Sequence, residues 1–105
     1  MAWIYLVLAG VCEIGWPIGL KLGWTADGAR PLWIGFAVLC MAVSGALLLM
    51  AQRTIPMGTA YAVWTGVGAA GTFVMGILMF GDAASAGRLV SVGLIIAGVV
   101  GLKFA

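Results

Sequence analysis

Glu13 lies halfway along a long apolar stretch, and its type and position suit it best among the residues of this chain to bind a cation. Trp16 follows three positions later, so in a helix the two side chains share one face. Tyr61 and Trp64 have the same spacing in a later apolar stretch. A carboxylate surrounded by indole and phenol rings can pair with a cation, while each ring face contributes about 0.5 to 2 kcal/mol. The four residues therefore predict a cation-binding site.

Hydroxyl groups could hold the Glu13 carboxylate in place, and Ser44 and Tyr61 are the candidates for this role. A planar guanidinium ion can donate two parallel N–H bonds to one carboxylate, a geometry that adds both strength and selectivity. A site with such polar groups rejects a ligand without N–H donors, because its own groups would stay unpaired. Ser44 therefore favours a guanidinium substrate, unless its hydroxyl bonds only to its own helix.

A proton competes with a cation for the same carboxylate, so Glu13 can hold one or the other but not both. Mutual exclusion at one site that opens to each side of a membrane in turn is sufficient for proton-coupled antiport. The alternative is a structural Glu13 that is neutral and hydrogen-bonded between helices, but acidic residues inside membranes are functional by default.

The composition indicates that these residues lie in a membrane. Of the 105 residues, 65% are hydrophobic and 8% are charged, against about 25% charged in a typical soluble domain. Four apolar stretches are long enough to cross a bilayer as helices; they cover 2–23, 32–51, 58–80 and 86–104. We therefore expect an all-α membrane protein, with one domain of four transmembrane helices over residues 1–105, short loops and lipid around it.

The same composition argues against several other functions. The chain has no histidine, and Cys12 and Cys40 stand far apart in apolar runs, so we expect no metal site. It lacks the nucleophile and base that a hydrolase or transferase needs, so neither enzyme activity nor a cofactor is expected. Its few charged residues form no basic block, which argues against nucleic-acid binding.

The distribution of basic residues predicts an antiparallel pair of chains. Short connections make neighbouring helices antiparallel, which puts Arg53 and Lys103 on the side of the N-terminus and Lys21, Arg30 and Arg88 on the other. This near balance leaves little signal for one orientation. The chain can therefore insert both ways, and a dimer of eight helices can shield Glu13 better than four helices can.

Small residues on the last two spans have two expected roles. Paired glycines are a usual site of helix bending, and Gly66 and Gly68 predict a bend in the third span, unless they serve only close packing. Small residues let membrane helices approach each other closely. Those of the fourth span predict the dimer contact, unless they pack only within one chain; they are Gly93, Ala97, Gly98 and Gly101.

A wider pattern includes these residues. It consists of Met1-Ala2-Trp3, Ala9-Gly10, Glu13, Trp16, Gly19-Leu20-Lys21, Pro56-Met57-Gly58-Thr59-Ala60-Tyr61-Ala62-Val63-Trp64-Thr65-Gly66-Val67-Gly68 and Gly98-Val99-Val100-Gly101-Leu102-Lys103. On these residues the chain resembles the small multidrug resistance family, and within it the guanidinium exporter subtype.

The resemblance implies an antiparallel dual-topology homodimer in the bacterial plasma (inner) membrane, which exports small guanidinium compounds in exchange for protons. It implies that Glu13 of each copy binds substrate or proton, and that the surrounding network consists of Trp16, Ser44, Tyr61 and Trp64. The chain departs from the family pattern in a longer first loop, in Pro17 and in Asp82. The first two are expected to touch the site or its gate, and Asp82 is not.

Other functions stay open at this point. The nearest is a promiscuous exporter of hydrophobic quaternary ammonium compounds, in the same family. A passive cation channel would show no coupling to a proton gradient. A proton-carrying rotor subunit would need a denser glycine repeat than the first span has, and an obligate heterodimer would need a stronger charge bias.

Overall fold

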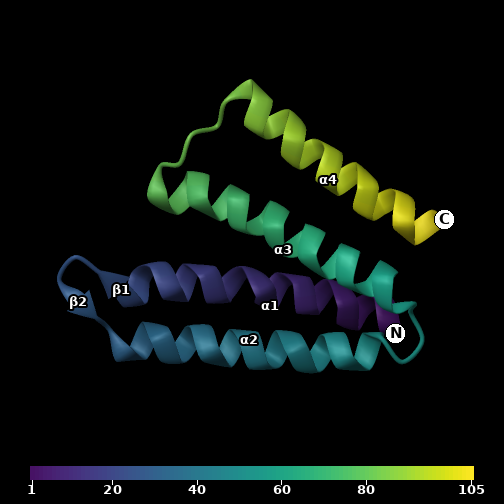
Figure 1. Ribbon diagram of the computed structural model, residues 1–105, viewed down its shortest axis with the longest axis horizontal. Helices are drawn as coiled ribbons and strands as arrows, with labels where there is room; N and C mark the ends of the chain where they lie inside the picture. The colour runs from purple at the N-terminus through teal and green to yellow at the C-terminus, as the bar shows by residue number, and fades with distance from the viewer.

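Four helices make up most of the chain in the computed structural model, which describes residues 1–105 (Figure 1). They are α1 (Ala2–Gly23), α2 (Pro31–Ala51), α3 (Met57–Phe80) and α4 (Ala86–Phe104). All four are long and apolar enough to cross a membrane. The predicted all-α fold with four spanning helices is confirmed, and α2 and α3 each begin one residue earlier than expected.

The helix ends follow from local chemistry. Pro31 begins α2, where its missing N–H would have no partner in any case. Gly81 ends α3 in the left-handed conformation, with φ 68°, which glycine adopts without the steric cost of a Cβ. The Ser85 hydroxyl caps α4 and accepts from the Arg88 N–H at 3.4 Å.

A small hairpin connects α1 to α2 where the sequence analysis expected only a loop. Its strands β1 (Trp24–Thr25) and β2 (Gly28–Ala29) pair antiparallel. Gly28 has a φ of 113°, a conformation that side chains rarely allow. Two strands of two residues each are too short to be recognised from a pattern of alternating residues.

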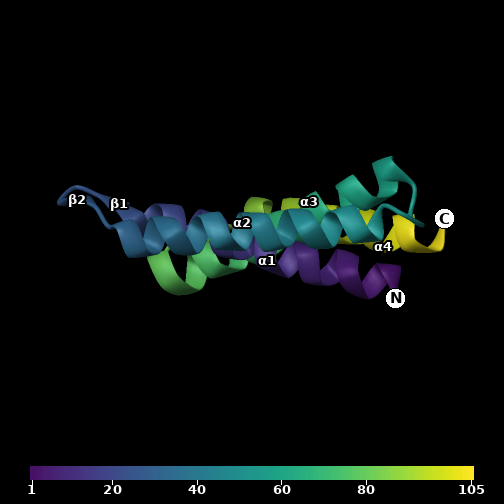
Figure 2. The same ribbon diagram turned by 90° about the horizontal axis from the view of Figure 1, so that it is seen from below.

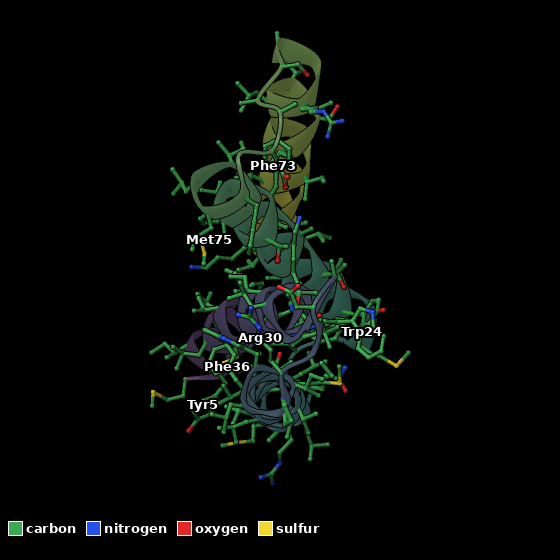
Figure 3. The ribbon with its side chains drawn as sticks, turned by 90° about the vertical axis from the view of Figure 1, so that its left-hand side faces the viewer. Tyr5, Trp24, Arg30, Phe36, Phe73 and Met75 are labelled. Atoms are coloured by element: carbon green, nitrogen blue, oxygen red, sulfur yellow. The ribbon has the colours of Figure 1, made fainter.

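The four helices lie in a single layer in the order α2, α1, α3, α4 (Figures 1 and 3). The layer measures 47 × 34 × 17 Å, and Figure 2 shows it edge-on. Since a helix with its side chains is about 10–12 Å wide, this slab is little more than one helix thick. Only 14 of the 105 residues are buried. A single chain therefore encloses almost no interior.

Glycines on α1 allow α2 to pack very closely against it. A Cβ at Gly19 would lie 2.9 Å from the Trp33 carbonyl oxygen and 2.9 Å from the Ala37 Cβ. Gly15 faces Cys40 in the same way, one turn earlier on α1. The two helices thus meet backbone to backbone, which is how membrane helices gain packing contacts.

Replacing Gly19 by Ala should therefore destabilise the fold by about 1–3 kcal/mol, because the added methyl group would overpack this seam. The measurement is the free energy of unfolding of the purified protein in mixed micelles titrated with a denaturing detergent. Gly35→Ala on α2 is the matched control, since a Cβ at Gly35 meets nothing within 4 Å. Equal stability of the two variants would contradict the close approach.

α4 contacts the rest of the chain mainly through α3, and none of its residues is buried. A Cβ at Gly66 would meet Val99 of α4. At the far end of α4, the Lys103 ammonium lies 5.7 Å from the centre of the Trp3 ring. Around Gly93, Gly98 and Gly101 a Cβ would meet nothing within 4 Å. These small residues of α4 therefore have no partner within the chain.

Candidate cation-binding site

Glu13 projects from the middle of α1 toward α3 and is half-buried. A Cβ at Gly68 of α3 would lie 2.6 Å from the Glu13 Cγ and 3.0 Å from its Cβ. Only a glycine at this position leaves room for the acidic side chain between the two helices. Gly10, one turn before Glu13, faces Val67 in the same way and keeps α1 and α3 close.

Two neighbouring polar groups contact the Glu13 carboxylate. Trp16 lies on the same helix face as Glu13, as the three-residue spacing predicted, and its Nε1 donates to Oε1 at 2.6 Å. The Ser44 Oγ lies 3.4 Å from Oε2. An ionised carboxylate offers about four acceptor sites, so even with both groups bonded to it the other sites stay free for a bound ion.

Ser44 joins three helices at this point. It is fully buried on α2, its hydroxyl donates to the Ala9 carbonyl of α1 at 2.6 Å, and it accepts from the Trp64 Nε1 of α3 at 2.8 Å. The hydroxyl therefore does not bond back to its own helix. Because it carries one hydrogen, it can donate to the Ala9 carbonyl or to Glu13, but not to both at once.

Tyr61 lies at the edge of the site. Its ring centroid is 5.3 Å from that of Trp64, at an interplanar angle of 52°, and the side chain is 57% exposed. The expected hydrogen bond from its hydroxyl to Glu13 is absent within the chain, and its ring packs against Trp64. Trp16, Ser44 and Trp64 do meet Glu13 or one another through hydrogen bonds.

The glycines expected to bend α3 lie within one continuous helix. Gly66 faces α4 at Val99, and Gly68 faces α1 at Glu13. In this conformation both positions serve close approach between helices. Bending at this pair stays a prediction.

A groove of about 420 Å³ opens beside Glu13 on one face of the slab. The residues that line it with Glu13 include Pro17, Thr65, Thr72, Phe73 and Asp82. The expectation that Asp82 lies away from the site is wrong. The chain reverses at Gly81 and brings Asp82 back over the end of α3, and sequence spacing alone does not show this reversal.

The site contains no group of three or more His, Cys, Asp or Glu residues that could hold a metal ion. Its chemistry is that of one hydrogen-bonded carboxylate, aromatic rings and hydroxyl groups beside an open groove. Such an arrangement can bind a small cation that donates hydrogen bonds, or a proton in its place.

Comparison with known proteins gives a consistent result. Residues 1–95 match the family model described as Small Multidrug Resistance protein. The chain is 50% identical over 105 residues to a guanidinium exporter of Yersinia pseudotuberculosis, and the aligned region covers 100% of this chain and 99% of the relative. It is 52% identical over 103 residues to a guanidinium exporter of Citrobacter freundii, and the aligned region covers 98% of this chain and 96% of the relative. A guanidinium exporter of Salmonella typhimurium strain LT2 is 48% identical with the same coverage.

Proposed function

The chain belongs to the small multidrug resistance family, and on this premise we propose that it is a proton-coupled antiporter that exports guanidinium and small substituted guanidinium cations. It is a transporter, not an enzyme, and a multi-pass protein of the bacterial inner membrane. The observation that carries the proposal is the Glu13 carboxylate, which the Trp16 N–H holds and the Ser44 hydroxyl approaches, while its remaining acceptor sites stay free beside the groove.

The free acceptor sites of Glu13 suit a planar donor. A guanidinium ion can offer two parallel N–H bonds to one carboxylate, and the Trp16 indole beside it is already fixed by its own hydrogen bond. The names of the relatives, which are about half identical to this chain over its whole length, support the same substrate class.

The Ser44 hydroxyl supports the proposed exchange with a proton. When Glu13 is ionised, Ser44 can turn its O–H from the Ala9 carbonyl toward Oε2. When Glu13 is protonated, its O–H can donate to the Ser44 Oγ, while Ser44 keeps its bond to Ala9. The Trp64 indole donates to Ser44 in both cases. The network thus satisfies both states of the carboxylate without moving a helix, and one carboxylate cannot hold proton and substrate together.

A second copy of this chain in antiparallel orientation completes the transporter in this proposal. The slab is little more than one helix thick, so the groove beside Glu13 has no cover from its own chain. The small residues of α4 have no partner within the chain and permit a close helix contact. The near balance of basic residues on the two sides allows both orientations.

The experiment that tests the proposal uses the purified chain alone in liposomes. Guanidinium should produce a transport current that reverses with an imposed proton gradient, and tetrapropylammonium, which has no N–H donor, should produce none. A current with tetrapropylammonium and not with guanidinium would instead identify an exporter of quaternary ammonium compounds. A guanidinium current that ignores the proton gradient would identify a passive channel.

A further inference from the structure

We propose that Asp82 is a second cation-contacting residue of the groove, which a guanidinium ion meets on its way to or from Glu13. This inference rests on the proposed function and extends it to the path of the substrate. Glu13 comes from the middle of α1 and Asp82 from the connection between α3 and α4, yet both line the same groove.

The two carboxylates lie along one face of α3. Glu13 packs over Gly68, and Asp82 packs over Gly76, where a Cβ would collide with its carboxylate. These glycines are eight residues apart, which corresponds to about 12 Å along a helix. Thr72 lies on the same face halfway between them and lines the groove. The face thus presents an acid, a hydroxyl and an acid in succession.

The fold holds Asp82 in this position. Gly81 turns the chain back with its left-handed conformation, and the Asp82 N–H donates to the Gly76 carbonyl at 3.1 Å. The absence of a side chain at Gly76 then leaves room for the carboxylate against the helix. The position therefore results from two glycines and one backbone hydrogen bond.

The Asp82 carboxylate has no cationic partner within the chain. Lys21 and Asp82 both line a smaller adjoining cavity of about 100 Å³. The Lys21 ammonium lies over the Phe80 ring instead, 4.7 Å from its centre. The carboxylate is thus free to attract a cation that enters or leaves.

The spacing determines how Asp82 acts. The two glycines over which the acids pack are about 12 Å apart along α3, which is longer than a guanidinium ion, so we infer that the two acids contact the substrate in succession rather than together. In an antiparallel pair, each side of the membrane has the Asp82 of one copy. Loss of Asp82 should therefore raise the KM from both sides, whereas the maximal rate, which depends on Glu13, should change little.

The test compares initial rates of radiolabelled guanidinium uptake by liposomes that contain the full chain. Asp82→Asn should raise the KM for guanidinium about three- to fivefold, the range expected for an exposed ionic contact, and change the maximal rate less than twofold. Asp82→Ser should do the same, and Asp82→Glu should restore the wild-type KM. Asp27→Asn is the matched control, because Asp27 lies in the hairpin at the same end of the molecule but outside the groove (Figure 1).

The outcomes separate the two proposals. An active wild type with an unchanged KM in both neutral variants overturns the role of Asp82 and leaves the proposed function standing. An equal rise in KM for Asp27→Asn would mean general attraction by surface charge and would also overturn it. A wild type that transports no guanidinium overturns the proposed function itself. The neutral variants should elute like wild type in gel filtration. If they do not, the KM values of Asp82→Glu and Asp82→Ala decide the question: a wild-type KM for Asp82→Glu and a raised KM for Asp82→Ala would support the role of Asp82, and equal KM values would overturn it.

Discussion

Replacing Glu13 by Gln is expected to reduce guanidinium transport at least about 100-fold and to remove its response to a proton gradient. Gln keeps the size of the side chain and a carbonyl oxygen for the Trp16 N–H, but it has neither a negative charge nor a site for a proton. A guanidinium ion would lose two charge-assisted hydrogen bonds, each of which contributes about 1.5–3 kcal/mol. The measurement is the substrate-induced current of the reconstituted variant.

Asp27→Asn provides the control for this variant, because it makes the same exchange of carboxylate for amide on an exposed hairpin. It should keep the wild-type current, and Glu13→Asp, which retains the charge, should keep a measurable one. If Glu13→Gln retained more than about a tenth of the current, Glu13 could not be the group that binds both substrate and proton. The polar network would then have a structural role only.

Replacing Gly68 by Ala is expected to lower transport about tenfold without loss of the folded protein. The new methyl group would lie 2.6 Å from the Glu13 Cγ, far inside normal contact distance, and this part of the side chain is too near the backbone to move freely. Glu13 would have to rotate away from Trp16, or α1 and α3 would have to separate. A displacement that raises the activation free energy of transport by about 1.4 kcal/mol corresponds to a tenfold loss of rate.

The matched control for this variant is Gly58→Ala, which adds the same methyl group in the first turn of α3, where a Cβ meets nothing within 4 Å. Both variants should elute like wild type in gel filtration, and only Gly68→Ala should lose transport. Full transport by Gly68→Ala would mean that Glu13 does not depend on the gap at this glycine. Loss of transport in both variants would mean instead that α3 tolerates no added methyl group, wherever it is placed.

Much of this molecule could be predicted from the sequence because a bilayer restricts the available structures. Backbone polar groups must be satisfied inside each apolar segment, so four stretches of about 20 apolar residues can only become helices. The pairing of Glu13 with Trp16 followed from the spacing within one helix, and the structure shows that hydrogen bond. The N-terminal cap at Ser85 was equally a local property.

Contacts between helices were less predictable, because periodicity shows which residues share a face but not which residues of another helix lie opposite. Ser44 was expected to bind either Glu13 or its own helix, and it bonds to the Ala9 carbonyl and to Trp64 as well. Tyr61 was expected to offer both its ring and its hydroxyl; its ring packs against Trp64, and its hydroxyl makes no hydrogen bond within the chain.

The sequence by itself determined the four spanning helices, the one acid within them and the aromatic and hydroxyl residues suited to a cation, since these depend on composition and on spacing along a single helix. Only the tertiary structure decided that the helices form one layer, that Gly68 leaves the gap for Glu13, and that Asp82 lies over Gly76. These features depend on how closely two backbones approach and on the turn at Gly81. Such distances are set by packing between segments far apart in the chain, and no local pattern of residues records them.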